Sequence, residues 1–370
     1  MAASNKLLGL EYMRGIAAFF VAVGHLTWPL WDANALADMV GKPTASVVAS
    51  MPNHLPHFYE FLPSSLFLVN CFFLLSGYVI QMSMIGNKPV PFLIQRFFRI
   101  YPVFFLSVLG GLLFGLFKGL PQPSLPTLFS EGLLIHGFTL NHAAWTLIYE
   151  VKFYLICALF MFLRLDIRLR CFSILVVMFV GLVLDYAHVP YSRLVGELTG
   201  IGMWITFMNV GSLAYFVREQ YLQDGRVDPK LIKFCAFVIV AFIVGCLFME
   251  HAPIGQAHYH NRDAAAFLGA FLVLVALLSL EHLLPKIRFL LFLGAISYPL
   301  YATHLLVGWY VFMLAFRTVG VTCAAFLSIS VSLIVAYAIH LFFEAPLNKL
   351  GKETARDWKN YFGLVKEKAA

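Results

Sequence analysis

The first apolar stretch of the chain, EYMRGIAAFFVAVGHLTWPLW, contains an arginine and a histidine eleven residues apart, Arg14 and His25. Eleven residues make almost three turns of an α-helix, so both side chains point to the same face, about 16 Å apart along the axis. A charged side chain inside a membrane-length apolar run is costly and usually faces a polar interior. The spacing therefore suits a long ligand with an anionic head and a reactive tail. The alternative is an arginine that reaches the lipid headgroups and a histidine that is hydrogen-bonded inside the bundle.

Two further motifs carry charge close to apolar segments. RFFRIYP places Arg96 and Arg99 on one helix face, where two guanidinium groups could clamp a phosphate or simply anchor the helix at the membrane surface. WTLIYEVKFY places Glu150 within an apolar span, flanked by Trp145 and Tyr154. An intramembrane carboxylate indicates a functional site. The alternative is an ion pair with an arginine or with the lysine two residues on, although residues two apart do not face each other on a helix.

Two more motifs are polar without charge, apart from one histidine. SYPLYATH places Ser297, Tyr301 and His304 along one helical stripe that could face a substrate or pack against another helix. FFLLSGYVI contains Ser76 next to a glycine, a pair that more often allows close helix packing than chemistry.

The elements that must position these residues are membrane helices. Of the 370 residues, 61% are hydrophobic and 12% are charged, whereas a soluble domain carries about 25% charged residues. We therefore expect an all-α polytopic helical bundle. The predicted spans are 12–30, 64–85, 100–118, 145–163, 171–188, 195–217, 231–250, 263–283, 289–314 and 320–343.

Charge decides between ten and eleven crossings, because 125–142 is apolar but short. If it does not cross and the N-terminus is cytoplasmic, 19 of the 26 lysines and arginines lie inside and five outside. An excess of this kind is the usual cytoplasmic signature, and an extra crossing would destroy it. We therefore predict ten spans with both termini cytoplasmic. A net charge of +7 distributed in this way does not indicate a nucleic-acid partner.

We predict a transmembrane domain, 1–350, followed by a basic cytoplasmic tail, 351–370. The first span lacks a signal-peptide cleavage pattern and should remain as a helix. The six cysteines lie in or at the edge of apolar runs without metal-ligand spacing. We read them as packing residues and expect no disulfide and no metal.

Together these motifs resemble the acyltransferase-3 family of membrane-bound O-acyltransferases. LEYMRGIAAFFVAVGH is similar to the family's opening arginine-x10-histidine pattern, and FFLLSGYVI, RFFRIYP, WTLIYEVKFY and SYPLYATH follow in the family's order. A closing E-x-P is matched in FFEAPLNKL. The chain departs from the family at Asn70, where an aspartate is frequent, and near Lys152, where a glutamine is frequent.

The resemblance implies acyl-CoA as donor, usually acetyl-CoA, and a carbohydrate or glycolipid hydroxyl as acceptor. It implies a stand-alone enzyme without a soluble esterase-like domain, which modifies exopolysaccharide, lipopolysaccharide or a related glycan. Such an enzyme would be a multi-pass protein of the cell membrane, the inner membrane in a Gram-negative cell.

Acyl transfer needs a base for the hydroxyl and a clamp for the thioester donor. His25 is the natural base, and Glu150 could orient its ring or hold the sugar. Arg14, Arg96 and Arg99 would bind the phosphates of coenzyme A. The remaining polar candidates are substrate-binding or structural: Asn70, Ser76, Trp145, Tyr154, Ser297, Tyr301 and His304.

A different class of function stays open. The same polar residues could form the path of a transporter for an organic acid or sugar, with His25, Glu150 and His304 as a proton relay. The sequence shows no inverted repeat and no matching pair of broken spans, which transporters often have.

Overall fold

The computed structural model describes residues 7–27, 65–119, 121–135, 140–187, 193–250 and 262–369, and within these ranges it contains helices and no strand. The α-helices are α1 (Leu8–Thr27), α4 (Ser65–Met84), α5 (Pro89–Lys118), α6 (Leu125–Gly132), α7 (Trp145–Phe162), α8 (Ile167–Tyr186), α9 (Arg193–Asp224), α10 (Pro229–Glu250), α11 (Arg262–Ser279), α12 (Arg288–Ile339) and α13 (Ala345–Ala369). Short 3₁₀ turns cover His142–Ala144 and Glu281–Leu283, and a π-helical turn covers His340–Glu344. The predicted all-α class is confirmed.

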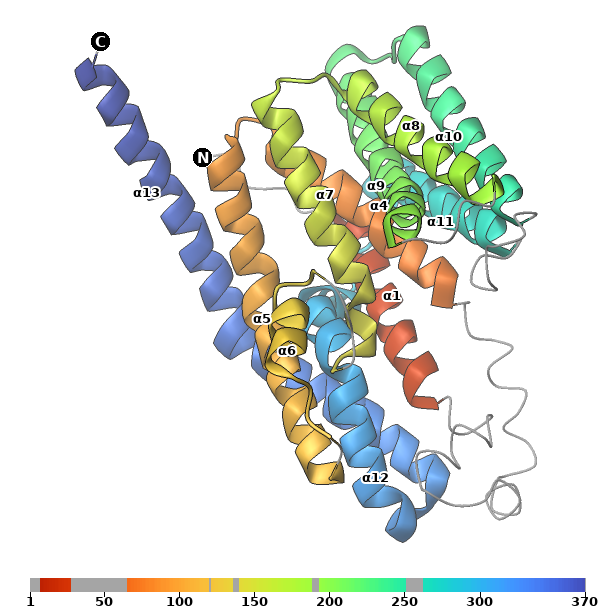
Figure 1. The fold of residues 1–370 in the computed structure, drawn as a ribbon, viewed down its shortest axis with the longest axis vertical. Helices are drawn as coiled ribbons and strands as arrows, with labels where there is room; N and C mark the ends of the chain where they lie inside the picture. The colour runs from red at the N-terminus through yellow and green to blue at the C-terminus, as the bar shows by residue number, and fades with distance from the viewer. Residues whose placement is uncertain are drawn as a thin grey trace.

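A helix occupies each of the ten predicted spans, and the last two spans lie in one interrupted helix. The spans 289–314 and 320–343 both lie in α12, which is interrupted at Gly320, where φ is 79° and ψ is 165°. Only glycine adopts this conformation readily, so it marks the reversal between two helices at the lower end of the view in Figure 1. Among the described residues, seven helices are long and apolar enough to cross a membrane. The count of ten crossings stays a prediction.

The segment 125–142 does not form a membrane-length helix in its described part. Helix α6 has eight residues and therefore extends about 12 Å, against the ~30 Å of a bilayer core. Glu131 in this helix is buried, and its carboxylate accepts a hydrogen bond of 3.1 Å from the backbone of Leu140. The short helix fits the prediction that this segment does not cross.

The charge pattern assigns the α4–α5, α7–α8 and α9–α10 loops to one side of the membrane, and all three lie at one end of the bundle. A cavity at this end is lined by residues near all three loops, including Ile85, Ile167 and Asp228. The end of α13 lies at the same end (Figure 1). Helix α13 runs beside α5, and Gly351 packs against Phe98. The arrangement agrees with a shared side for these loops, and which face of the membrane that is stays a prediction.

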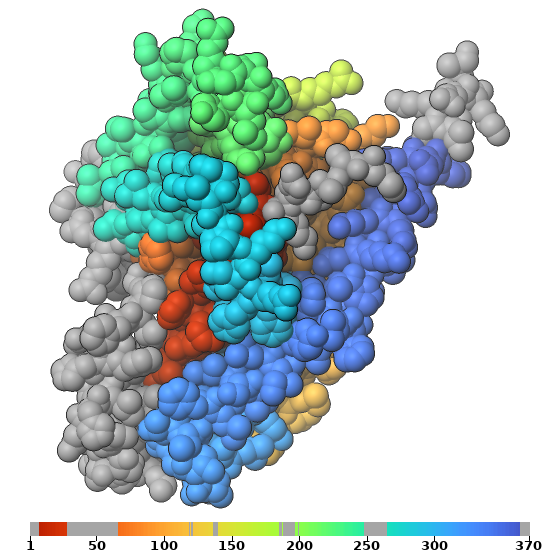
Figure 2. Space-filling view, turned by 180° about the vertical axis from the view of Figure 1, so that it is seen from behind, coloured from red at the N-terminus to blue at the C-terminus, as the bar shows by residue number. Residues whose placement is uncertain are grey.

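Helix α1 lies in the interior of the bundle. It is apolar around most of its circumference, and a helix of that kind is buried by its neighbours. Figure 2 shows it only as a narrow red strip between α11 and α12. Gly15 touches α12 so closely that an added Cβ would lie 2.5 Å from the backbone nitrogen of Gly294. Arg14 is thereby held against the start of α12.

Helices α4 and α9 approach each other as closely. A Cβ on Gly77 would lie 1.7 Å from the carbonyl oxygen of Met208, and one on Gly211 would lie 2.0 Å from that of Leu74. The interpretation of the Ser76–Gly77 pair as a site of close helix approach is therefore confirmed for Gly77. It is incomplete for Ser76, whose hydroxyl donates a hydrogen bond to Glu150 on α7.

Candidate active site

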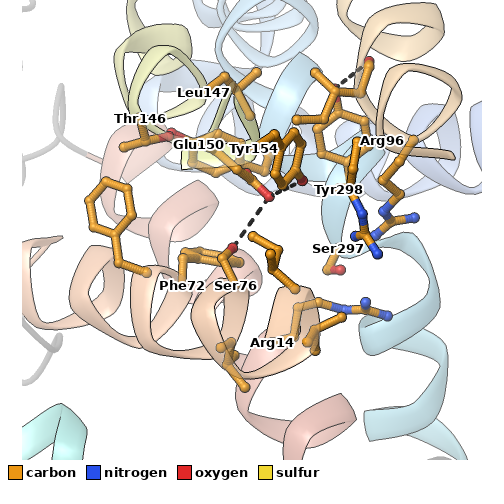
Figure 3. A pocket seen from close by; sticks show the side chains of 17 residues that line it. Arg14, Phe72, Ser76, Arg96, Thr146, Leu147, Glu150, Tyr154, Ser297 and Tyr298 are labelled. Atoms are coloured by element: carbon orange, nitrogen blue, oxygen red, sulfur yellow. Dashed lines mark hydrogen bonds between the residues drawn. The ribbon is translucent and has the colours of Figure 1, made fainter. Parts of the chain in front are cut away.

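Two cavities inside the bundle contain most of the predicted site residues. The first, called here the arginine cavity, has a volume of about 110 Å³ and is lined by α1, α4, α5, α7 and α12 (Figure 3). Its lining includes eight of the candidates: Arg14, Ser76, Arg96, Arg99, Glu150, Tyr154, Ser297 and Tyr301. Five helices that are distant in sequence thus bring the predicted cationic and acidic groups to one space.

The three arginines of this cavity differ in their partners. Arg14 donates hydrogen bonds of 2.8 Å to the carboxylate of Glu11 and to the carbonyl of Gly294. Arg99 forms an ion pair with Glu344. Arg96 lies over the rings of Phe92 and Tyr154, 5.5 and 5.6 Å from their centroids. Within the described part of the chain, Arg96 is the one of the three that has no carboxylate partner.

Glu344 is a site residue that the sequence analysis quoted without assigning it a role. Its side chain is 1% exposed and is shared between Arg99 and His340, whose Nδ1 lies 2.6 Å from Oε2. The residue ends the π-helical turn His340–Glu344, a type of irregularity that occurs frequently at functional sites. The closing E-x-P pattern was the available signal, but its partner Arg99 lies 245 residues earlier.

Glu150 is held by hydroxyl groups. Tyr154 donates a hydrogen bond of 2.6 Å to Oε1, and Ser76 donates one of 3.3 Å to the same atom, both drawn as dashed lines in Figure 3. Lys152 forms its ion pair with Glu197 on α9. The Glu150–Lys152 pair considered above is therefore replaced by a pair to a carboxylate that the sequence analysis did not single out.

The second cavity, called here the histidine cavity, has a volume of about 460 Å³ and is lined by residues including His25, Trp145, Tyr301 and Trp309. Tyr301 lines both cavities, and its hydroxyl donates to the carbonyl of Ala143 at 2.5 Å. The same hydroxyl lies 2.5 Å from that of Thr146. This tyrosine therefore forms a wall common to the two spaces.

The ring of His25 contacts another histidine. Its Nδ1 lies 2.8 Å from Nε2 of His304, which is itself fully buried. Glu150 bonds instead to Tyr154 and Ser76. The expectation that Glu150 could orient the ring of His25 is not what this geometry shows, and the alternative role of holding the sugar stays a prediction.

Three candidates form no hydrogen bond to another site residue among the described residues: Trp145, Ser297 and Asn70. Trp145 packs edge-on against Trp204, with ring centroids 5.2 Å apart, while also lining the histidine cavity. Ser297 donates a hydrogen bond of 2.8 Å to the carbonyl of Gly294 in its own helix. Asn70 is fully buried, lines neither cavity, and its amide has no hydrogen-bond partner within the described ranges.

Fold and site together define a polytopic helical membrane protein with a polar interior, in which an arginine cluster and a histidine pair lie on the two sides of one tyrosine. The family model described as an acyltransferase domain, acyltransferase-3, matches residues 7–341. The chain belongs to the acyltransferase-3 family, and this membership supports acyltransferase activity in a membrane. Searches of curated proteins and of solved structures find no match to the chain.

Proposed function

We propose that this protein transfers an acyl group, most simply acetyl, from cytoplasmic acyl-CoA to a hydroxyl of a cell-surface or exported glycan. The observation that carries the proposal is the pair of cavities that share Tyr301, one lined by three guanidinium groups and the other by His25. A donor with an anionic head and a thioester end needs cationic groups to bind the head and a base near the thioester. The family membership supplies the reaction class.

The donor fits the arginine cavity only in part. A volume of about 110 Å³ is below the ~300–1,000 Å³ of pockets that enclose a drug-sized ligand. The nucleotide of coenzyme A would therefore stay at the mouth, where guanidinium groups can bind its phosphates. Only the narrow thiol arm would pass inward towards Tyr301 and His25. In this arrangement the arginines set donor affinity, and the histidine sets the rate of the chemical step.

The acceptor suits the larger cavity. About 460 Å³ lies within the usual range for a small ligand. Trp145 and Trp309 contribute aromatic surface to its lining, and His25 contributes a polar group. A sugar ring has apolar faces and polar edges, which matches such a lining. The hydroxyl to be acylated would then approach the ring of His25.

The reaction follows from these positions. His25 removes the proton of the acceptor hydroxyl, the oxygen attacks the thioester carbonyl, and the carbon–sulfur bond breaks. The departing thiolate of coenzyme A receives the proton back from the histidine. An acyl-enzyme is not needed, and neither cavity-lining serine bonds to a histidine among the described residues: Ser76 donates to Glu150 and Ser297 to a backbone carbonyl.

The test is release of free coenzyme A thiol by the purified protein in lipid nanodiscs, supplied with acetyl-CoA and extracted cell-surface glycan. Replacing His25 with alanine should lower turnover on the order of a hundredfold or more, the scale of general-base catalysis. His282→Ala is the matched control, because His282 is exposed and lines neither cavity. Wild-type turnover in the His25 variant would refute the assignment of the base.

Transport is tested with the same purified protein reconstituted into sealed lipid vesicles. Uptake of an organic acid or sugar into these vesicles, without consumption of thioester, would favour the hypothesis that the protein is a transporter. Mass spectrometry of surface glycans from cells with and without the protein identifies the acceptor and the acyl group.

A further inference from the structure

The hydrogen bonds of His304 determine where its proton lies. Nδ1 of this ring is 2.9 Å from the carbonyl oxygen of Tyr301 and 3.0 Å from that of Leu300. A carbonyl oxygen can only accept a hydrogen bond, so Nδ1 must carry the proton. In a neutral ring, Nε2 is then an acceptor with no proton of its own.

The geometry of the two rings extends this argument to His25. Nδ1 of His25 lies 2.8 Å from Nε2 of His304, the ring planes are 8° apart, and the centroids are 5.2 Å apart. Two rings joined by so short a nitrogen–nitrogen contact reach this centroid separation only when they lie end to end in one plane. This is the geometry of an N–H···N hydrogen bond, with His25 as donor.

A doubly protonated His304 would reverse the direction of this hydrogen bond, but its surroundings oppose the charge. The residue is 0% exposed, and within the described residues no carboxylate contacts its ring. A buried charge without a partner is costly. The neutral form, with Nε2 as acceptor, is therefore the one that fits the site.

The consequence falls on the other nitrogen of His25. With its proton on Nδ1, Nε2 is left with a free lone pair, and the hydrogen bond found for this ring among the described residues is made by Nδ1. His25 lines the histidine cavity, so this lone pair is the basic atom offered to a ligand there.

We propose that His304 is a positioning residue that fixes His25 in the Nδ1–H tautomer and so presents Nε2 as the proton acceptor for the acceptor hydroxyl. The inference rests on the proposed function for its catalytic meaning. When Nε2 takes the hydroxyl proton, His25 becomes an imidazolium whose Nδ1–H still donates to Nε2 of His304. The proton then leaves from Nε2 to the thiolate of coenzyme A. The helix carbonyls and His304 together fix the tautomer and orientation of His25, as a buried aspartate does for the histidine of serine proteases.

Two substitutions of His304 separate positioning from packing. Gln can still place an amide oxygen where Nε2 lies and accept from His25, whereas Leu cannot accept. His304→Leu should lower kcat by about tenfold to a hundredfold, part of the full contribution of a general base, while KM for acetyl-CoA stays unchanged. His304→Gln should recover most of the lost turnover. His282→Leu, on the exposed turn, is the matched control.

The tautomer itself is measured by nuclear magnetic resonance of protein labelled with ¹⁵N-histidine, with the His25 signals assigned as those lost in His25→Gln. The parent and His304→Gln should show His25 with its proton on Nδ1, and His304→Leu should show protonated Nε2. The proposal is overturned if His25 in the parent carries its proton on Nε2, or if His304→Leu keeps the parent's kcat. Parent protein that shows the expected tautomer but consumes no thioester would refute the proposed function and leave the positioning intact.

Discussion

Replacing Arg96 with alanine should weaken binding of coenzyme A more than any other single change in the arginine cavity. Arg14 and Arg99 already donate to carboxylates, so part of their hydrogen-bonding capacity is used within the protein. Arg96 is opposed by no carboxylate among the described residues, and its contacts are to the rings of Phe92 and Tyr154. Its hydrogen-bonding capacity is therefore the most available of the three to an anionic ligand.

The magnitude follows from the strength of one charge-assisted hydrogen bond. Such a bond contributes about 1.5–3 kcal/mol, which corresponds to a rise in Kd of roughly 10- to 150-fold. Arg96→Lys should fall in between, because lysine keeps the charge but loses the planar fork and stacks less well on the two rings. Calorimetric titration of coenzyme A into purified protein measures the change directly.

Arg168→Ala is the matched control for Arg96→Ala. Arg168 lies on α8, pairs with Asp228 at 3.4 Å, and its side chain is 47% exposed. Its loss removes the same charge from the same predicted side of the membrane, away from the arginine cavity. The reasoning is refuted if Arg96→Ala binds coenzyme A as the parent does. Equal losses in both variants would refute it too, because binding would then reflect net charge rather than this cavity.

Three further predictions concern stability and topology. Arg99→Ala removes one of the two partners of the buried Glu344 carboxylate, which keeps its contact with His340. It should lower the free energy of unfolding by about 2 kcal/mol, less than the loss for a fully buried pair, because Arg99 is 29% exposed. Adding Glu344→Gln should return most of the thermal stability, and no recovery would argue against the pair. Gly77→Ala should reduce Tm and yield, since its Cβ would overlap the backbone of α9, and an unchanged Tm would show that the two helices are further apart. A cysteine at position 226 should be protected from an impermeant thiol reagent outside the cell and one at position 258 labelled, and the opposite pattern would reverse the predicted orientation.

The sequence by itself determined the elements and the positions of charge along them. Low charge content and apolar runs of membrane length predict helices because backbone groups in a bilayer must be paired within their own segment. The helical periodicity relates Arg14 to His25 and Arg96 to Arg99 without any tertiary information. The distribution of lysines and arginines predicted that the short apolar run 125–142 does not cross the membrane. The eight-residue helix α6 agrees with that prediction.

Only the tertiary structure decided which of these groups meet. Glu344 and Arg99 are 245 residues apart, and His25 and His304 are 279 apart. Periodicity relates residues within one helix, whereas contacts between helices depend on packing, as where Gly15 lets α1 touch α12. The sequence therefore supplied two histidines with several open roles. The carbonyls of α12 and the approach of α1 are what assign a proton to each ring, because hydrogen-bond direction depends on the atoms within reach and on no pattern along the chain.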